Sequence, residues 1–287
     1  MNIFTSPDKK SISGWGFTSY SLKVLALLLM TLDHIYYYLG GGILPVPHFF
    51  TLLGRISAPL FLFARAEGFS HTHDRKAYLK RLYIASVLMS MSNDLVNSYL
   101  PHPNGAMVIN GMFATLFIIG LYIWAVELLI ESVKGKNRKK ICAALAMFLI
   151  PVLSGIAITL FLGNAAAVPL IGRMAVRILG TLVPSPIFVE GSVFWVVLGI
   201  GFYFLRDKKI RLSVFYVLMS GFFFLSAAGA GMTYENLFIL NDQWFMILSL
   251  PFILLYNGQR GRKMKYFFYV YYPLHVYVLV VLARILA

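Results

Sequence analysis

The chain has 287 residues, of which 59% are hydrophobic and only 13% are charged, and its formal net charge at pH 7 is +14. A soluble protein of this length cannot bury so much apolar surface, so the composition predicts an integral membrane protein. The basic residues lie in short clusters between apolar stretches, as in the loops of membrane proteins, which argues against nucleic acid as a partner.

The apolar stretches predict an all-α membrane protein with about nine transmembrane helices, eight to ten in all. A cytoplasmic arm at 1–20 precedes a single membrane domain at 21–287. In the segment 163–189, Arg173 and Arg177 have helical spacing and prolines interrupt the chain, which predicts an amphipathic or re-entrant helix at about 165–182. The expected spans lie at about 21–39, 48–68, 78–98, 107–131, 141–162, 190–206, 212–230, 243–257 and 266–286.

The basic clusters give these spans an orientation. Apart from 163–189, the connections alternate between basic ones and ones almost free of Lys and Arg. The positive-inside rule places the basic connections in the cytoplasm, with the N-terminus inside and the C-terminus outside. The four clusters lie within 65–81, 134–140, 206–211 and 260–265.

The first span carries an acid and an imidazole side by side, Asp33 and His34. An ionisable group at membrane depth costs roughly 2.5 kcal/mol or more on insertion scales, so such residues usually face a protein interior or a water-filled cavity. Two interpretations stay open at this point. The pair either holds this helix to a neighbour by polar contacts, or it is a catalytic or proton-handling dyad.

Several helices place polar residues at a similar depth in the membrane. At about 1.5 Å per residue, His34 lies roughly 18 Å into the first span and His275 roughly 16 Å into the last. A shared depth favours one internal cavity, although Arg55 could simply neutralise Asp33. By the same count Arg55 and Asn93 lie slightly deeper, and two further polar residues lie towards the outer face, Asn110 and Glu190.

These polar residues belong to longer motifs that resemble the TraX family. Leu22-Lys23 followed by Met30-Thr31-Leu32-Asp33-His34 resembles the opening motif of that family. The resemblance covers nearly the whole chain and is weakest across 140–190. The further matching motifs, in chain order, are Gly54-Arg55-Ile56, Pro59-Leu60-Phe61, Glu67-Gly68-Phe69, Asn110 with Thr115-Leu116, Tyr256-Asn257-Gly258 with Arg260-Gly261, and Tyr272-Pro273-Leu274-His275.

The resemblance implies an integral membrane acyltransferase of the bacterial cytoplasmic membrane, surrounded by lipid and using acetyl-CoA as donor without a metal. The resemblance does not fix the acceptor, and the candidates are a pilin or another peptide N-terminus, or an envelope glycan. In that chemistry His34 is expected to be the base or a transient acyl carrier, because histidine is the usual base near neutral pH. Asp33 would orient His34 or balance Arg55, and His275 would donate to the oxyanion or bind the acceptor.

The remaining candidate residues divide by expected partner. Those expected to contact the acceptor are Arg55, Asn110, Asn93, Glu190 and Tyr272. Those expected to hold CoA, mostly through its phosphates, are Arg65, Arg75, Lys76, Arg81, Asn257, Arg260 and Arg262.

Two functions of other classes compete with the acyltransferase. A transporter or flippase could use Asp33 and His34 as a proton relay. The sequence shows no internal repeat of the kind that marks many transporters. A non-catalytic membrane assembly factor is the third possibility.

Overall fold

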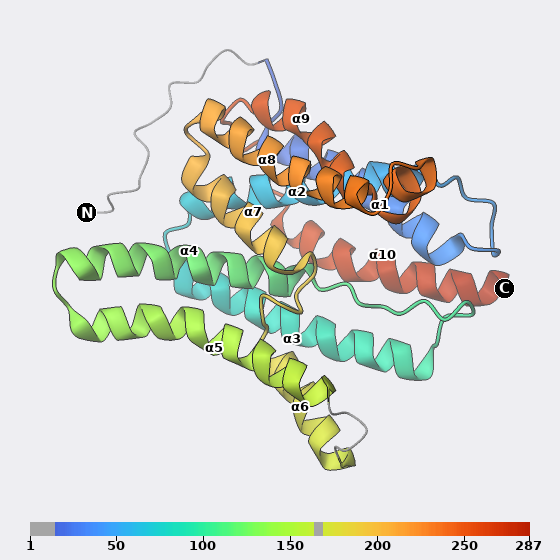
Figure 1. Ribbon diagram of the computed structural model, residues 1–287, viewed down its shortest axis with the longest axis horizontal. Coiled ribbons are helices and arrows are strands. Elements are labelled where there is room, and N and C mark those ends of the chain that lie inside the picture. The colour runs from blue at the N-terminus through green and yellow to red at the C-terminus, as the bar shows by residue number, and fades with distance from the viewer. Residues whose placement is uncertain (1–14, 164–168) are drawn as a thin grey trace. The chain divides into compact units, whose positions relative to one another are not determined.

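The computed structural model describes residues 15–163 and 169–287, and across these ranges the chain is helical apart from connections and one isolated parallel bridge, Phe17 to Tyr256 (Figure 1). The all-α fold class is therefore confirmed. The elements in chain order are α1 (Ser19–Leu39), α2 (Phe49–Ser70), α3 (Arg75–Tyr99), α4 (Met112–Lys134), α5 (Arg138–Gly163), α6 (Leu170–Leu182), α7 (Ser192–Leu205), α8 (Lys209–Gly229), the π-helix η2 (Asn236–Leu240), the 3₁₀-helix η3 (Asp242–Ser249), α9 (Leu250–Leu254) and α10 (Lys265–Leu286).

Among the described residues, six helices are long and apolar enough to cross a membrane: α1, α2, α4, α5, α8 and α10. The apolar helix α7 and the continuous apolar segment of η3 and α9 are shorter. At 25 residues α3 is long, but its charged and polar side chains keep it outside that set. Each expected span thus coincides with a helical segment, and six of these segments have the length and hydropathy of a span.

Two expected helix starts differ more from the observed ones than the other boundaries do. The fourth helix begins at Met112 instead of 107, because Gly111 forms its N-cap and the residues before it are not helical. The helix expected at about 165–182 is observed at Leu170–Leu182. Residues 165–168 of that expectation lie outside the described residues, as do residues 1–14 of the expected arm.

The described chain divides into two compact units, the first formed by 15–71, 96–108 and 201–287. In this unit α1 packs along α2, and η3 packs on α2 and α8. The Ser57 hydroxyl on α2 donates a 2.7 Å hydrogen bond to the Ala26 carbonyl on α1. Small and polar side chains of this kind let membrane helices approach closely.

The connection before α10 closes the N-terminal end of α1. The first amides of α1 lack partners within the helix, and those of Ser19 and Tyr20 donate to the carbonyls of Gln259 and Arg260 at 2.8 and 3.1 Å. Gly261 has a φ of +70°, and a Cβ there would lie 2.7 Å from the Thr18 hydroxyl. The sequence motif around Arg260-Gly261 therefore has a structural role, because only glycine allows this close approach.

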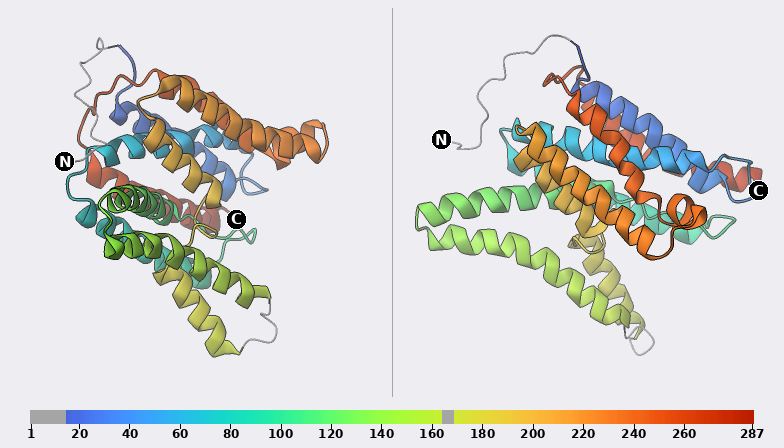
Figure 2. Two further views of the ribbon diagram at one scale, coloured as in Figure 1. Left: turned by 60° about the vertical axis from the view of Figure 1, so that its left-hand side comes forward. Right: turned by 45° about the horizontal axis from the view of Figure 1, so that its top comes forward.

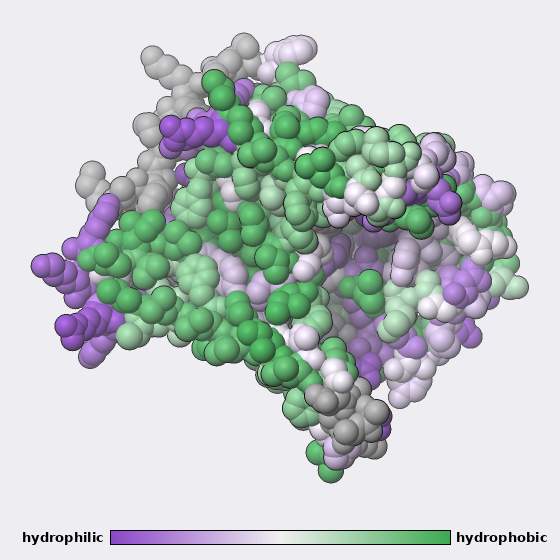
Figure 3. Space-filling view, viewed as in Figure 1, coloured by the Kyte–Doolittle hydropathy of each residue, from purple (hydrophilic) through white to green (hydrophobic). Residues whose placement is uncertain are grey.

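The second unit comprises the described parts of 72–95 and 109–200, and α4 and α5 form a hairpin in it. Both panels of Figure 2 show these two helices side by side. In Figure 3 hydrophobic residues cover the flanks of α4 and α5, and hydrophilic residues gather at the end where the two helices join. That end holds the basic cluster at 134–140, as expected for a helical pair that ends at a membrane surface.

Candidate functional site

The two ionisable residues of α1 point to different neighbours. Successive residues on an α-helix project about 100° apart, and here Asp33 faces α2 while His34 faces α10.

 Asp33 was expected either to orient His34 or to balance the charge of Arg55. The structure shows the pairing with Arg55, and the Asp33 carboxylate points away from the His34 ring.

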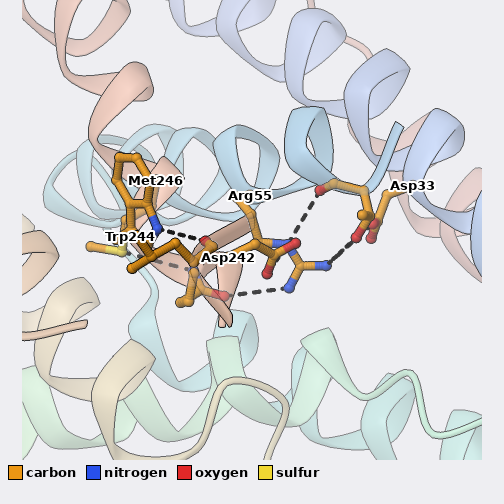
Figure 4. A network of polar contacts seen from close by, with 8 residues as sticks. Asp33, Arg55, Asp242, Trp244 and Met246 are labelled. Atoms are coloured by element: carbon orange, nitrogen blue, oxygen red, sulfur yellow. Dashed lines mark hydrogen bonds and ion pairs between the residues drawn. The ribbon is translucent and has the colours of Figure 1, made fainter. Parts of the chain in front are cut away.

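Arg55 on α2 lies between two carboxylates (Figure 4). Its Nη2 is 3.2 Å from Oδ1 of Asp33, and its Nε is 3.6 Å from Oδ1 of Asp242 at the start of η3. The same guanidinium donates to the Thr51 hydroxyl at 3.0 Å and to the Gln243 side chain at 3.4 Å. All three charged side chains are at most 28% exposed, and Arg55 is a cation shared by the two carboxylates.

Gly54 explains how Asp33 reaches this network. A Cβ at Gly54 would overlap the carboxylate carbon of Asp33, so the missing side chain leaves the space that the carboxylate occupies. Sequence analysis identified Asp33 and Arg55 but missed Thr51, Asp242 and Gln243. The sequence signal that could have found two of them is an acidic residue followed by an amide residue at the start of the eighth expected span.

The other face of α1 contributes to a pair of buried histidines. The Nδ1 atom of His34 lies 2.7 Å from Nε2 of His275 on α10. The two residues are 8% and 7% exposed, and their rings are inclined by only 11° with centroids 4.9 Å apart. That separation matches one hydrogen bond plus a ring radius on each side, so the rings meet edge to edge in nearly one plane.

Aromatic and hydroxyl groups hold this pair in place. The ring of Tyr271 lies 5.1 Å from that of His275 at an angle of 12°, and its hydroxyl is 2.9 Å from the Thr31 hydroxyl on α1. Tyr272, expected to contact the acceptor, is buried with its ring 6.0 Å from His275. The first unit therefore brings together three of the expected site residues, His34, His275 and Tyr272.

An apolar cluster lies next to the histidine pair along α1 and α10. It begins one turn beyond His34 with Tyr38 and directly after His275 with Val276. Such a cluster excludes water from that side of the imidazoles and strengthens polar contacts between them. Its buried members are Tyr38, Leu39, Val108, Val276, Leu279, Val280 and Ala283.

The second unit holds a separate polar cluster at the start of α4. Asn93 on α3 donates to the Asn110 carbonyl at 2.8 Å, and the Glu190 carboxylate accepts from the Gly111 amide at 2.8 Å. The Thr115 hydroxyl donates to the Glu190 carbonyl at 2.8 Å. Asn93, Asn110 and Glu190 are thus brought together, and their bonds to backbone groups complete the N-terminal end of α4.

The residues expected to hold CoA are in different environments. In the first unit Arg65 on α2 has buried Nε and Nη2 atoms and stacks over Phe69 with 5.2 Å to the ring centroid. Lys23, one turn inside α1, is close enough to Arg65 and Arg260 for their positive charges to act on it. Sequence analysis missed Lys23 as a candidate because a single lysine near the end of a span is ordinary.

Asn257 and Arg262 lie in the connection that closes α1. The Asn257 side chain accepts from the Gln259 amide at 3.0 Å and its backbone amide donates to the Phe17 carbonyl at 2.9 Å, so it shapes the turn. The side chains of Arg260 and Arg262 are exposed. Together with Lys23 and Arg65, these cations suit the phosphates of a nucleotide, which prefer several cationic donors.

The predicted CoA residues of α3 lie in the second unit. Arg75 forms a bidentate ion pair with Glu127 on α4, and both side chains are mostly buried. Lys76 and Arg81 are exposed, and Arg81 lies over the Tyr78 ring at 5.8 Å. Arg75 therefore differs from its neighbours, because its charge already has a carboxylate partner within the protein.

The apolar helices and the ionisable groups buried among them define a helical membrane protein with a polar interior. The chain belongs to the TraX family, because the family model described as TraX protein matches residues 19–283. No curated protein and no solved structure matches it. Within the described ranges no three His, Cys, Asp or Glu side chains gather as a metal site would require.

Proposed function

We propose that this chain is an acetyltransferase of the bacterial cytoplasmic membrane, which moves an acetyl group from cytoplasmic acetyl-CoA to an amine or hydroxyl. The observation that carries the proposal is the buried pair of His34 and His275, 2.7 Å apart, in a chain of the TraX family. Placing an imidazole at this depth in a membrane costs free energy, so such residues usually have a function or a polar partner. Histidine suits proton transfer near neutral pH.

The proposed topology has nine spans with the N-terminus in the cytoplasm and the C-terminus outside. The six long apolar helices support most of it, and α3, α7 and the η3–α9 segment would supply the other three. The four basic clusters would then face the cytoplasm, in contact with lipid head groups. Cysteine-accessibility labelling at 134–139 and 206–211 tests this arrangement.

The proposed reaction needs one base. The acceptor nitrogen or oxygen attacks the thioester carbon, a C–N or C–O bond forms, and the C–S bond breaks. His34 takes the proton from the attacking atom and returns it to the CoA thiolate, so the overall reaction is balanced. The oxyanion that develops needs a hydrogen-bond donor, and our candidate is Tyr272, whose ring centroid lies 6.0 Å from that of His275.

The cations of the first unit support acetyl-CoA as the donor. Arg65 and Arg260 both act electrostatically on Lys23, and an anionic ligand would relieve this repulsion. We therefore expect the CoA phosphates near these residues, with Arg262 on the exposed side. The acceptor in this proposal is a pilin or other peptide N-terminus, or an envelope glycan.

The transporter hypothesis receives less support from the geometry. A relay through Asp33 and His34 needs the two groups to exchange protons, but Asp33 is held by Arg55 on α2 while His34 is paired on α10. The two polar clusters of α1 thus serve different neighbours. This division favours a base at His34 and a structural ion pair at Asp33.

The experiment uses purified protein in lipid nanodiscs with radiolabelled acetyl-CoA and an extract of bacterial envelope. We expect label to enter one acceptor class, protein or glycan, and a His34→Gln variant of equal stability to transfer it at least about 10²-fold more slowly. The exposed histidine variant His73→Gln is the matched control and should transfer normally. Equal labelling by wild type and His34→Gln would remove the catalytic role.

A further inference from the structure

The hydrogen bonds around His275 determine which of its nitrogens carries a proton. Its Nδ1 lies 2.9 Å from the Tyr271 carbonyl, one helical turn earlier on α10. A carbonyl oxygen can only accept a hydrogen bond, so Nδ1 of His275 must carry the hydrogen. In a neutral imidazole the other nitrogen, Nε2, then holds the lone pair and accepts.

His275 in turn determines which nitrogen of His34 carries a hydrogen. The Nδ1 of His34 is 2.7 Å from that accepting Nε2, and the nearly coplanar rings point the two nitrogens at each other. A contact of this length requires a donor, so His34 carries its own hydrogen on Nδ1. Its basic lone pair is then on Nε2, at the opposite corner of the ring.

We infer that His275 is a positioning residue that fixes His34 as the Nδ1–H tautomer and makes Nε2 the atom that accepts the proton. The inference rests on the proposed function in one respect, the role of His34 as the base. It gives His275 a role different from oxyanion binding, because the Nε2 edge of His275 is occupied by His34.

Contacts on both sides of Tyr271 hold His275 in this arrangement. The Thr31 hydroxyl donates to the Leu27 carbonyl at 2.8 Å, which leaves its oxygen to accept from the Tyr271 hydroxyl at 2.9 Å. The Tyr271 ring lies nearly parallel to His275, and the Tyr271 carbonyl accepts from the His275 ring. Tyr271 therefore ties α10 to α1 one turn before His34 and orients His275 at the same time.

The arrangement also helps His34 to carry a positive charge during turnover. When Nε2 of His34 takes a proton, its Nδ1–H bond to His275 becomes charge-assisted and stronger. The Nδ1 proton can then move to Nε2 of His275, so two imidazoles share one charge in an apolar setting. Returning the proton to the CoA thiolate restores both neutral tautomers, and no proton is gained or lost.

The first test is nitrogen NMR on full-length protein in lipid nanodiscs, with ¹⁵N-labelled histidine and no acetyl-CoA. His34→Gln and His275→Gln variants assign the signals. We expect His34 to be protonated on Nδ1 and to carry its lone pair on Nε2. A resting protein with His34 protonated on Nε2, or with both nitrogens of His275 protonated, would overturn the inference.

His102 is an internal reference in the same spectrum. It is buried to a similar extent, but its Nε2 lies 2.8 Å from the Tyr38 carbonyl and its Nδ1 accepts from the Asn104 amide at 3.2 Å. These contacts assign it the opposite tautomer, Nε2–H. Observing opposite tautomers for His34 and His102 separates a specific effect of His275 from a general effect of burial.

The second test replaces His275. In His275→Ala we expect His34 to lose its single tautomer and kcat to fall by roughly 10²-fold or more, with a smaller change in KM. His275→Gln keeps a side-chain acceptor and should recover part of both, whereas His102→Gln should leave the His34 tautomer unchanged. An unchanged His34 tautomer in His275→Ala overturns the inference. If the wild type has no transferase activity but shows the expected tautomers, only the proposed function is contradicted.

Discussion

Two buried polar clusters of this protein differ in what their side chains bind. In the second unit Asn93, Glu190 and Thr115 all bond to backbone groups around the start of α4. In the first unit His34 bonds to His275, Arg55 to Asp33, and Tyr271 to Thr31, so side chains bond to other side chains. Both clusters were expected to take part in one site.

The difference separates structural polar groups from candidates for chemistry. Side chain to side chain bonds are a small minority of protein hydrogen bonds, and most polar side chains bond to backbone or water. A cluster that completes a helix end has a sufficient structural reason to be there. His34 and His275 lie inside α1 and α10, away from the helix ends, and the bond between them joins side chain to side chain.

The largest expected effect is at His34. We expect His34→Ala to lower acetyl transfer by about 10²–10⁴-fold, the usual loss for a general base, while CoA binding stays nearly intact. His34→Gln should be no better, because an amide cannot take a proton at neutral pH. Turnover, CoA affinity and melting temperature are measured for each variant, and wild-type turnover in His34→Gln would make the histidine pair structural, like the second cluster.

The next effect concerns the charges around Arg55. Removing Arg55 leaves Asp33 and Asp242 without their shared cation, so Arg55→Gln should lower the free energy of unfolding by about 1–3 kcal/mol. Asp33→Asn should cost less, because Arg55 keeps Asp242. Thermal unfolding in nanodiscs checks this order. The reverse order would mean that Asp33 has a role beyond pairing with Arg55.

Arg75 and Arg260 sharpen the comparison between the units. Arg75 is paired with Glu127, so Arg75→Gln should destabilise the protein by about 1–2 kcal/mol with little loss of CoA affinity. The exposed Arg260→Gln should weaken CoA binding by roughly tenfold without destabilising, as expected for a phosphate contact. Calorimetric titration with CoA and thermal unfolding separate the two, and equal CoA losses would place both residues at the donor site.

The smallest expected effect is at Glu190. Glu190→Gln keeps an oxygen that can accept from the Gly111 amide, so its stability should change by less than about 1 kcal/mol, and Glu190→Ala should cost about 1 kcal/mol. Neither variant should change kcat at a temperature where the protein is folded. A selective loss of kcat in Glu190→Gln would move the second cluster into the catalytic site.

The sequence alone determined the class of the protein and most of its helices. Apolar runs long enough to cross a membrane, broken by glycine, proline and basic clusters, predict helices because a bilayer leaves the backbone few other ways to satisfy its hydrogen bonds. The same local signals located Asp33, His34, Arg55 and His275, because ionisable residues are conspicuous within apolar runs. The motif at Asn257 and Arg260 was visible too, although its turn-forming role was not.

Only the tertiary structure decided which polar groups meet. Depth along a helix follows from the residue count, but the direction of a side chain depends on how the helices pack, and that depends on contacts far apart in sequence. Asp33 and His34 are neighbours in the chain and yet bind α2 and α10. The pairing of Arg75 with Glu127, the place of Asp242 beside Arg55 and the tautomer of His34 likewise arise from residues that only folding brings into contact.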